Sequence, residues 1–464
     1  MKKYLLIISC IIAQFSALAD VQLPAIIGDH MVLQQKSKVK LWGWTTNPSE
    51  TVKIKVSWDT TNYKTVAKYG HWVVEINTPG ASENQNIRIS GSKNTIQISD
   101  VLIGEVWLFS GQSNMEWGGN QNLKETMDEM PNATNKSIRF FYIPKATADY
   151  PQEDVRAKWV VCNPEDMKSF SAIGYFFGKK INEKLGVPMG LINSNWGGTP
   201  AEVWVPQDKV LGNTKLVEAA KKLQTFDFWS SRAGDNYNAM IAPILNYQLA
   251  GVLWYQGESN VGQYSSYTEL MNELILSWRA GFNKNLPFYF AQIAPYDKYP
   301  SNLGAKLREA QTRNLALENT GMVVLTDLVP DVTNIHPTQK VEVANRFANL
   351  ALVKTYGQSA GPMMYPKYDR HRIEKNKMRI YFKELGGKLM TKDGGEPSHL
   401  MIAGEDQKFY PAKGKIDGNT LVVSSEEVPN PVAVRYAFNN IDMPNLFTKE
   451  GLPVNLFRTD NWDN

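Results

Sequence analysis

Short apolar runs that alternate with helical stretches between residues 101 and 360 constrain the fold more than any other feature of this chain. Such runs are typical of parallel strands buried on both faces of a sheet. The apolar runs are Val106–Phe109, Gly190–Asn193, Gly251–Tyr255, Phe288–Ile293 and Met322–Leu325. The helical stretches are Ala172–Leu185, Tyr267–Phe282, Leu303–Asn319 and Lys340–Tyr356. This order predicts an α/β fold whose parallel sheet is covered by helices on both faces.

Segments with β-type alternation and frequent turn residues flank this region on both sides. The N-terminal runs are Val39–Trp44, Val52–Trp58, Trp72–Ile76, Ile87–Ile89 and Thr95–Ile98. The C-terminal runs are Arg379–Phe382, Thr420–Ser424 and Ala433–Phe438. We therefore expect β domains over residues 20–100 and 361–464 around an α/β domain over residues 101–360. The sequence leaves open whether the two β segments form one module or two.

The first 19 residues have the pattern of a secretion signal. Lys2 and Lys3 precede an apolar run over residues 4–12, and a small-residue cleavage site ends at Ala19. The run is too short for a membrane span, which takes about 20 residues. We expect export, with cleavage near Ala19, to the periplasm or the cell exterior. Cys162 is then the one cysteine of the mature chain, so no disulfide framework is predicted.

The charge distribution argues against a nucleic-acid partner. The formal net charge is +4, and the lysines and arginines are scattered along the chain. Nucleic-acid binding requires a concentrated basic patch or stripe, and the sequence contains none. The oligomeric state is not predicted.

Ser113 follows the first buried strand, in the sequence Gly111-Gln112-Ser113-Asn114-Met115. Open α/β sheets bind ligands at this end of their strands, where a following helix points free N–H groups outward. The position suits a nucleophile. On spacing alone, a serine N-cap with a glycine turn is the simpler interpretation.

Two further polar segments follow the next two predicted strands. In the first, Gly197 and Gly198 let backbone N–H groups approach a ligand closely, as oxyanion stabilisation requires. In the second, the side chain of Asn260 can donate to an oxyanion, while Gln256 and Glu258 brace the loop or bind sugar hydroxyls. The alternatives are a tight turn with packed tryptophans and a solvated turn.

Among the five histidines of the chain, only His336 lies in the α/β region. A neutral imidazole is the usual base for a serine hydroxyl. A lone histidine is more often structural. Its position after the last predicted strand and before a helix nevertheless suits the base of a system in the order Ser then His.

These four segments, in this order from Gly111 to Pro337, resemble the sequence blocks of the sialate O-acetylesterase family in the SGNH hydrolase superfamily. The resemblance extends to residues 307–311, 435–438, 446–447 and 457–460, and thus covers nearly the whole predicted mature chain. It implies a three-layer α/β/α sandwich with flanking antiparallel β domains. It also implies a serine esterase that removes acetyl groups from sugars, most favourably O-acetylated sialic acids, without cofactor or metal.

The same resemblance implies roles for individual residues. Ser113 is the expected nucleophile and His336 its base. The expected oxyanion donors are the N–H of Ser113, Gly197 or Gly198, and the side chain of Asn260. The candidate sugar-binding residues are Gln112, Trp117, Trp196, Tyr255, Gln256 and Glu258, and the aromatic ones among them are equally candidates for the core. Trp204 is expected in the core.

The sequence departs from the family pattern just before the histidine. An aspartate commonly precedes that histidine by two or three residues, where this chain has Thr333 and Asn334. Asp331 is the nearest preceding carboxylate. We therefore expect a dyad of Ser113 and His336, with Asp331 or a backbone carbonyl as the orienting group.

Two other functions remain open. The first is deacetylation of a plant polysaccharide such as xylan, since related sequence blocks serve both substrates. A sialic acid carries a carboxylate that favours an arginine in the pocket, and Arg308 is a candidate. The second is a non-catalytic carbohydrate-binding protein, which the intact Ser113, Asn260 and His336 argue against.

Overall fold

The computed structural model describes residues 21–463, so the predicted secretion signal lies outside the described residues. Its central sheet has the strand order β10-β9-β11-β8-β12-β13-β14. Neighbouring strands are parallel, except that β10 runs antiparallel to β9 at the edge. The strands are β8 (Thr95–Gly111), β9 (Asn135–Tyr142), β10 (Trp159–Cys162), β11 (Met189–Asn195), β12 (Gly251–Tyr255), β13 (Phe288–Ala291) and β14 (Thr320–Val323). The predicted parallel sheet is confirmed, and β9 and β10 extend it.

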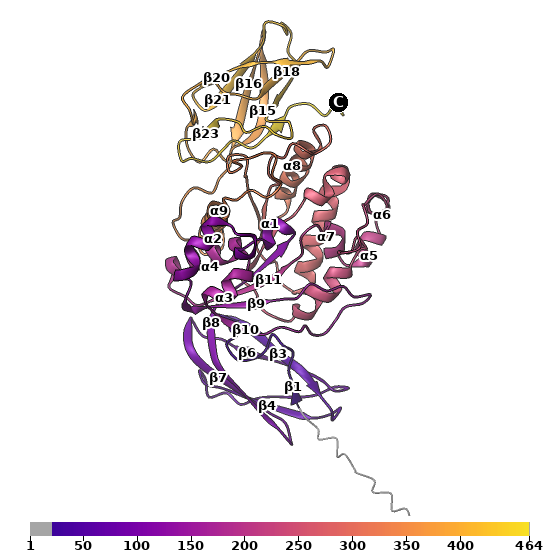
Figure 1. Ribbon diagram of the computed structural model, residues 1–464, viewed down its shortest axis with the longest axis vertical. Coiled ribbons are helices and arrows are strands. Elements are labelled where there is room, and N and C mark those ends of the chain that lie inside the picture. The colour runs from indigo at the N-terminus through magenta and orange to yellow at the C-terminus, as the bar shows by residue number, and fades with distance from the viewer. Residues whose placement is uncertain (1–20, 464) are drawn as a thin grey trace, which may run out of the picture.

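Helices cover both faces of this sheet (Figure 1). On one face, Trp107 and Phe109 of β8 contact Phe177 of α4 edge to face. On the other, Trp254 of β12 contacts Trp278 of α7. Because Leu253 is in register with Phe109, Trp254 points to the opposite face. The main covering helices are α4 (Ala172–Leu185), α7 (Tyr264–Gly281), α8 (Leu303–Arg313) and α9 (Lys340–Lys354). The fold is therefore a three-layer α/β/α sandwich.

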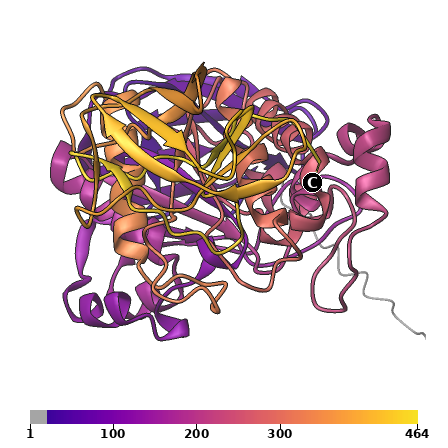
Figure 2. The same ribbon diagram turned by 90° about the horizontal axis from the view of Figure 1, so that it is seen from above.

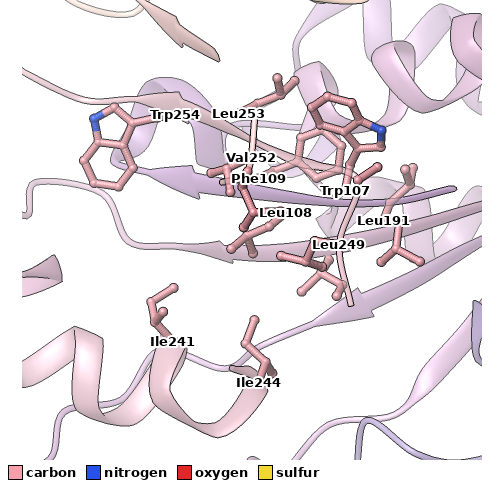
Figure 3. Close-up of a cluster of buried hydrophobic side chains, with 14 of the residues drawn as sticks. Trp107, Leu108, Phe109, Leu191, Ile241, Ile244, Leu249, Val252, Leu253 and Trp254 are labelled. Carbon is pink, nitrogen blue, oxygen red and sulfur yellow. The ribbon is translucent and has the colours of Figure 1, made fainter. Parts of the chain in front are cut away.

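Shorter helices connect these layers. They are α1 (Ser113–Glu116), α2 (Lys124–Glu129), α3 (Pro164–Ser169), α5 (Gln207–Leu211) and α6 (Thr214–Ala220). A short helical segment over residues 237–244 points Ile241 and Ile244 towards the buried strands (Figure 3). No helix among the described residues is long and apolar enough to cross a membrane.

The N-terminal β domain is continuous with the sandwich. Its strands are β1 (Val21–Gln22), β2 (Val32–Gln34), β3 (Lys38–Thr45), β4 (Thr51–Val56), β5 (Tyr63–Val66), β6 (His71–Asn77) and β7 (Ser82–Ser90). The first part of β8 pairs with β7, and its last part pairs with β11 and β12. The predicted boundary at residue 100 thus falls inside one strand, and both parts share a single hydrophobic core.

The C-terminal antiparallel domain has a hydrophobic core of its own. Its strands are β15 (Lys367–Glu374), β16 (Lys377–Lys383), β17 (Leu389–Thr391), β18 (Leu400–Ala403), β19 (Phe409–Pro411), β20 (Lys413–Asp417), β21 (Thr420–Ser424), β22 (Ala433–Tyr436), β23 (Leu446–Thr448) and β24 (Phe457–Arg458). Figure 1 shows the two β domains at opposite ends of the sandwich, and Figure 2 shows the C-terminal strands lying above it. The flanking β segments therefore form two modules.

Candidate active site

The nucleophile candidate lies at a tight turn between β8 and α1. Gly111 has φ +131°, and a Cβ placed on it would lie 2.2 Å from the carbonyl oxygen of Tyr255 on the neighbouring strand. The N–H of Gln112 donates to that same carbonyl, at 3.0 Å. Only glycine allows this close approach, so the turn fixes Ser113 at the start of α1, at the carboxyl end of the sheet.

Ser113 and His336 meet at this end of the sheet, although 223 residues separate them in the chain. The distance from Ser113 Oγ to His336 Nε2 is 2.8 Å. With its proton on Nδ1, the imidazole accepts a hydrogen bond from the serine hydroxyl through Nε2. Both side chains line a cavity of about 590 Å³, which is large enough for a sugar.

The surroundings of His336 favour its neutral form. Burial, together with the smaller effect of the Lys340 ammonium group, lowers the pKa of the imidazole to about 4. The ring is therefore uncharged near neutral pH. An uncharged imidazole that faces a hydroxyl at this distance has the protonation state and the geometry that a general base requires.

Asp331 does not orient this imidazole in the structure. Its Oδ1 accepts hydrogen bonds from the N–H and the hydroxyl of Thr333, at 2.9 and 2.7 Å. Within residues 21–463, no carboxylate contacts the ring of His336. The Oδ1 of Asn334 instead accepts from the backbone N–H of His336, at 2.9 Å. The carboxylate of Asp331 therefore shapes its own turn, and the expectation that it orients the base does not fit this geometry.

An aromatic side chain, and not a carboxylate, contacts the ring of His336. The indole of Trp117 stacks on the imidazole of His336, with ring centroids 3.8 Å apart and an interplanar angle of 22°. Trp117 also lines the cavity, where it was expected to contact sugar. One face of the indole is therefore covered by the imidazole and is not open to a sugar.

The candidate oxyanion donors differ in what they already bind. Within residues 21–463, the N–H groups of Ser113 and Gly198 donate no hydrogen bond, so both are free for a ligand. The N–H of Gly197 donates to Oε2 of Glu116, at 2.6 Å. A Cβ on Gly197 would lie 3.2 Å from that of Ser113, so this glycine borders the nucleophile directly.

Asn260 does not face the cavity, contrary to expectation. Its side chain is fully buried, and its amide donates to Oε2 of Glu202, at 2.8 Å. Its Oδ1 accepts from the N–H of Ala201 and from the amide of Gln256, at 2.9 and 2.7 Å. Asn260 therefore ties the loops after β11 and β12 together, and its buried amide does not line the cavity in this conformation.

The predicted sugar-binding residues separate into two groups. Gln112, Trp117 and Glu258 line the cavity. Tyr255 and Gln256 are buried beneath it, and the half-buried Trp196 does not line it. Of the two roles left open for these last three residues, sugar contact and a structural role, the structure favours the structural one, because it packs them below or beside the site. Trp204 is fully buried, as expected for a core residue.

A buried polar network beneath the dyad was not predicted from the sequence. The amide of Asn114 donates to Oε1 of Glu258 at 2.6 Å and to the carbonyl of Ile335 at 3.0 Å. Its Oδ1 accepts from Nζ of Lys340, at 2.7 Å. Burial raises the pKa of Glu258 and lowers that of Lys340 to about 7. The network connects the nucleophile turn, the β12 loop and the histidine loop.

A charged pair on the cavity wall was also missed. The Nζ of Lys145 lies 2.6 Å from Oε1 of Glu116, whose other oxygen accepts from Gly197. Glu116 stands in the same motif as Ser113, three residues later, so the motif itself was the signal that could have indicated it. Among the described residues, no cluster of three or more His, Cys, Asp or Glu side chains could hold a metal ion.

One cavity brings together a serine hydroxyl, a neutral imidazole and two free N–H groups. These are the groups that acyl transfer requires as nucleophile, base and oxyanion donors. Comparison with known proteins agrees. Residues 103–353 match the family model described as carbohydrate esterase, sialic acid-specific acetylesterase. The chain is 30% identical to the sialate O-acetylesterase of Homo sapiens over 373 residues, covering 72% of this chain and 70% of that protein.

Two further relatives cover as much or more. The sialate O-acetylesterase of Mus musculus is 30% identical over 417 residues, covering 76% of this chain and 77% of that protein. A crystal structure of a carbohydrate acetylesterase from Xanthomonas citri has a TM-score of 0.87 and 34% identity, covering 96% of this chain and 100% of that chain. The resemblance seen in the sequence is thus confirmed. The chain belongs to the sialic acid-specific acetylesterase family of carbohydrate esterases, and it is a carbohydrate acetylesterase.

Proposed function

We propose that Ser113 and His336 hydrolyse O-acetyl esters of sugars through a covalent acetyl-enzyme. The observation that carries this proposal is the 2.8 Å contact between Ser113 Oγ and His336 Nε2 in a cavity of sugar size. Nε2 takes the hydroxyl proton while Oγ forms a bond to the acetyl carbon. The ester bond to the sugar oxygen then breaks, and that oxygen leaves with the proton from His336.

Deacylation follows the same path with water in place of the sugar. His336 takes a proton from water, the hydroxide oxygen bonds to the acetyl carbon, and the bond to Ser113 Oγ breaks. The proton returns to Oγ and acetate leaves. The N–H groups of Ser113 and Gly198 are the donors available to the oxyanion in both steps.

O-acetylated sialic acid is the first substrate to test, because the mammalian relatives are sialate O-acetylesterases. Lys145 on the cavity wall offers an ammonium group to a sugar carboxylate. Arg308 does not serve this purpose, because it is fully buried and donates to the carbonyl of Asn439. Lys145, and not the candidate Arg308, is therefore the cation that this proposal assigns to a sugar carboxylate.

One observation favours an acetylated neutral polysaccharide such as xylan. Lys145 is already paired with Glu116, so the cavity wall carries no net charge from this pair. A carboxylate that approached Lys145 would also approach Glu116, which costs electrostatic energy. A neutral sugar can accept a hydrogen bond from Lys145 and donate one to Glu116 at the same time.

Acetate release from O-acetylated sialic acid and from acetylated xylan, measured side by side for the wild type and Ser113→Ala, tests these proposals. Serine-dependent release from sialic acid alone supports the first substrate, and release from xylan alone supports the second. Release that survives Ser113→Ala would contradict the mechanism. Binding of the glycan without release of acetate would instead indicate a non-catalytic carbohydrate-binding protein.

We also propose that the chain is exported and cleaved after Ala19. The support is the charged and apolar pattern of residues 1–19. N-terminal sequencing of the protein from the periplasm or the medium tests this, and a start at Asp20 is the expected result. A cytoplasmic protein that begins at Met1 would contradict it.

A further inference from the structure

We propose that the loop over residues 224–229 forms a subsite for a neutral oligosaccharide chain, so that the substrate is an acetylated glycan rather than a free acetylated monosaccharide. This inference rests on the proposed esterase function and specifies its substrate class. The loop follows α6 and carries three clustered aromatic rings, two of which line the cavity. We call it the aromatic loop.

The aromatic loop contacts the backbone close to the nucleophile. Gly197 borders Ser113, because a Cβ placed on this glycine would lie only 3.2 Å from the serine Cβ. The next residue, Gly198, has φ +82°, and a Cβ there would lie 2.4 Å from the ring of Trp229. Since consecutive Cα atoms are about 3.8 Å apart, the first aromatic ring contacts the residue next to the glycine that borders Ser113, within reach of a sugar chain held there.

The rings continue outward from Trp229. The centroids of Phe226 and Phe228 each lie 4.6 Å from that of Trp229, and 5.7 Å from each other. Phe226 and Trp229 line the catalytic cavity. Phe228 is 65% exposed and Phe226 is 36% exposed. The cluster is therefore a continuous aromatic surface that starts at the cavity wall and ends in solvent.

Packing alone does not account for this surface. The contact with Gly198 explains Trp229, but it gives no reason for an exposed phenylalanine beyond it. Exposed aromatic groups that are continuous with a ligand cavity mark binding surfaces. Pyranose rings have apolar C–H faces that suit aromatic faces, and polar edges that need hydrogen bonds.

Polar groups of the required kind stand beside the rings. The side chain of Gln224 lines the cavity, and within residues 21–463 neither its amide nor the indole N–H of Trp229 forms a hydrogen bond. An uncharged amide and an uncharged N–H bind sugar hydroxyls without favouring an anion. The chemistry therefore points to a neutral glycan chain as the occupant.

The test compares each acetylated monosaccharide with its own oligosaccharide. One pair is acetylated xylose and acetylated xylohexaose, and the other is O-acetylated sialic acid and an O-acetylated sialyl trisaccharide. We expect Phe228→Ala to lower the oligosaccharide-to-monosaccharide ratio of kcat/KM about tenfold in the pair that the wild type hydrolyses. Phe228→Trp should restore that ratio. Tyr69→Ala removes a 95% exposed ring on the N-terminal domain and should leave the ratio within about twofold.

A binding measurement separates this inference from the esterase proposal. Titration calorimetry of unacetylated xylohexaose and of the sialyl trisaccharide into Ser113→Ala protein needs no turnover. Weaker binding in Ser113→Ala/Phe228→Ala supports the subsite even if no sugar ester is hydrolysed. Binding and kcat/KM ratios that do not respond to Phe228→Ala would overturn the subsite and leave the esterase proposal intact.

Discussion

The imidazole of His336 lies flat against the indole of Trp117, 3.8 Å between ring centroids. Where a carboxylate would hold the ring edge by a hydrogen bond, the indole holds the ring face. The face of an indole is electron-rich, so it also attracts the imidazole when that ring becomes a cation during proton transfer. We therefore propose that stacking supplies orientation and charge stabilisation to His336, whose ring has no carboxylate partner among the described residues.

Trp117→Ala should lower kcat/KM for p-nitrophenyl acetate by about tenfold to a hundredfold, because the imidazole loses the surface that fixes its plane. Trp117→Phe should retain most of the activity. Since burial is the main cause of the low histidine pKa, the alanine variant should also move the acid limb of the pH profile upward, towards 6.5. An unchanged limb together with unchanged kcat/KM would contradict this role.

The pH dependence of the wild type follows from the same site. In the proposed mechanism His336 is active when neutral, and its pKa is lowered from 6.5 to about 4. Activity should therefore persist well below pH 6.5 and fall only as the pH drops through about 4. Between these values the unfolded chain binds the proton more readily, so this group's contribution to stability is present above pH 6.5 and is lost towards pH 4. A kcat/KM profile with an acid limb centred near 6.5 would contradict the expected shift.

Gly197→Ala should reduce kcat by about tenfold or more with little change in melting temperature. The new Cβ would lie 3.2 Å from the Cβ of Ser113 and 3.1 Å from Oε2 of Glu116, so it crowds the reacting centre. Gly262→Ala is the matched control, because no atom lies within 4 Å of a Cβ there. Equal activity of the two variants would show that the space beside Ser113 is not used.

The sheet was predictable where burial is complete. The runs at Gly251–Tyr255 and Val106–Phe109 are apolar because both faces are covered, and β12 and β8 contain them. β9 and β10 were not predicted. β9 lies near the edge and contains Lys136 and Arg139, of which Arg139 reaches across to Asp100 at 3.0 Å. Charged residues inside such a strand break its apolar pattern. The sequence does not show that a carboxylate 39 residues away compensates the charge of Arg139.

The two central site residues were predictable for a different reason. Ser113 and His336 both follow buried strands, and such strands end at the same edge of a parallel sheet. The position of a residue after a strand does not determine which way its side-chain amide points. Whether Asn260 faces the cavity depends on Glu202, whose carboxylate lies after β11 and accepts a hydrogen bond from the Asn260 amide. The stacking of Trp117 on His336 likewise joins residues that are far apart in the sequence, and it becomes visible only in the folded structure.

The loop that carries His336 is anchored at its start by a buried ion pair. Both guanidinium NH groups of Arg346 on α9 donate to the carboxylate of Asp327, at 2.8 and 2.6 Å. The side chains of Arg346 and Asp327 are 4% and 7% exposed. Removing Asp327 leaves the buried guanidinium of Arg346 with only the half-exposed Glu342 as a counter-charge, which is strongly destabilising.

Asp327→Asn should therefore lower the free energy of unfolding by about 3 to 5 kcal/mol, measured by urea denaturation. Glu342→Gln is the matched control, because Glu342 binds the same guanidinium at 3.2 Å but is 47% exposed. Its removal should cost less than about 1 kcal/mol, since water screens the pair. Similar losses in the two variants would show that burial of the Asp327 pair does not stabilise the histidine loop. A larger loss for Asp327→Asn, with activity falling at temperatures below global unfolding, would show that the pair holds the base in place.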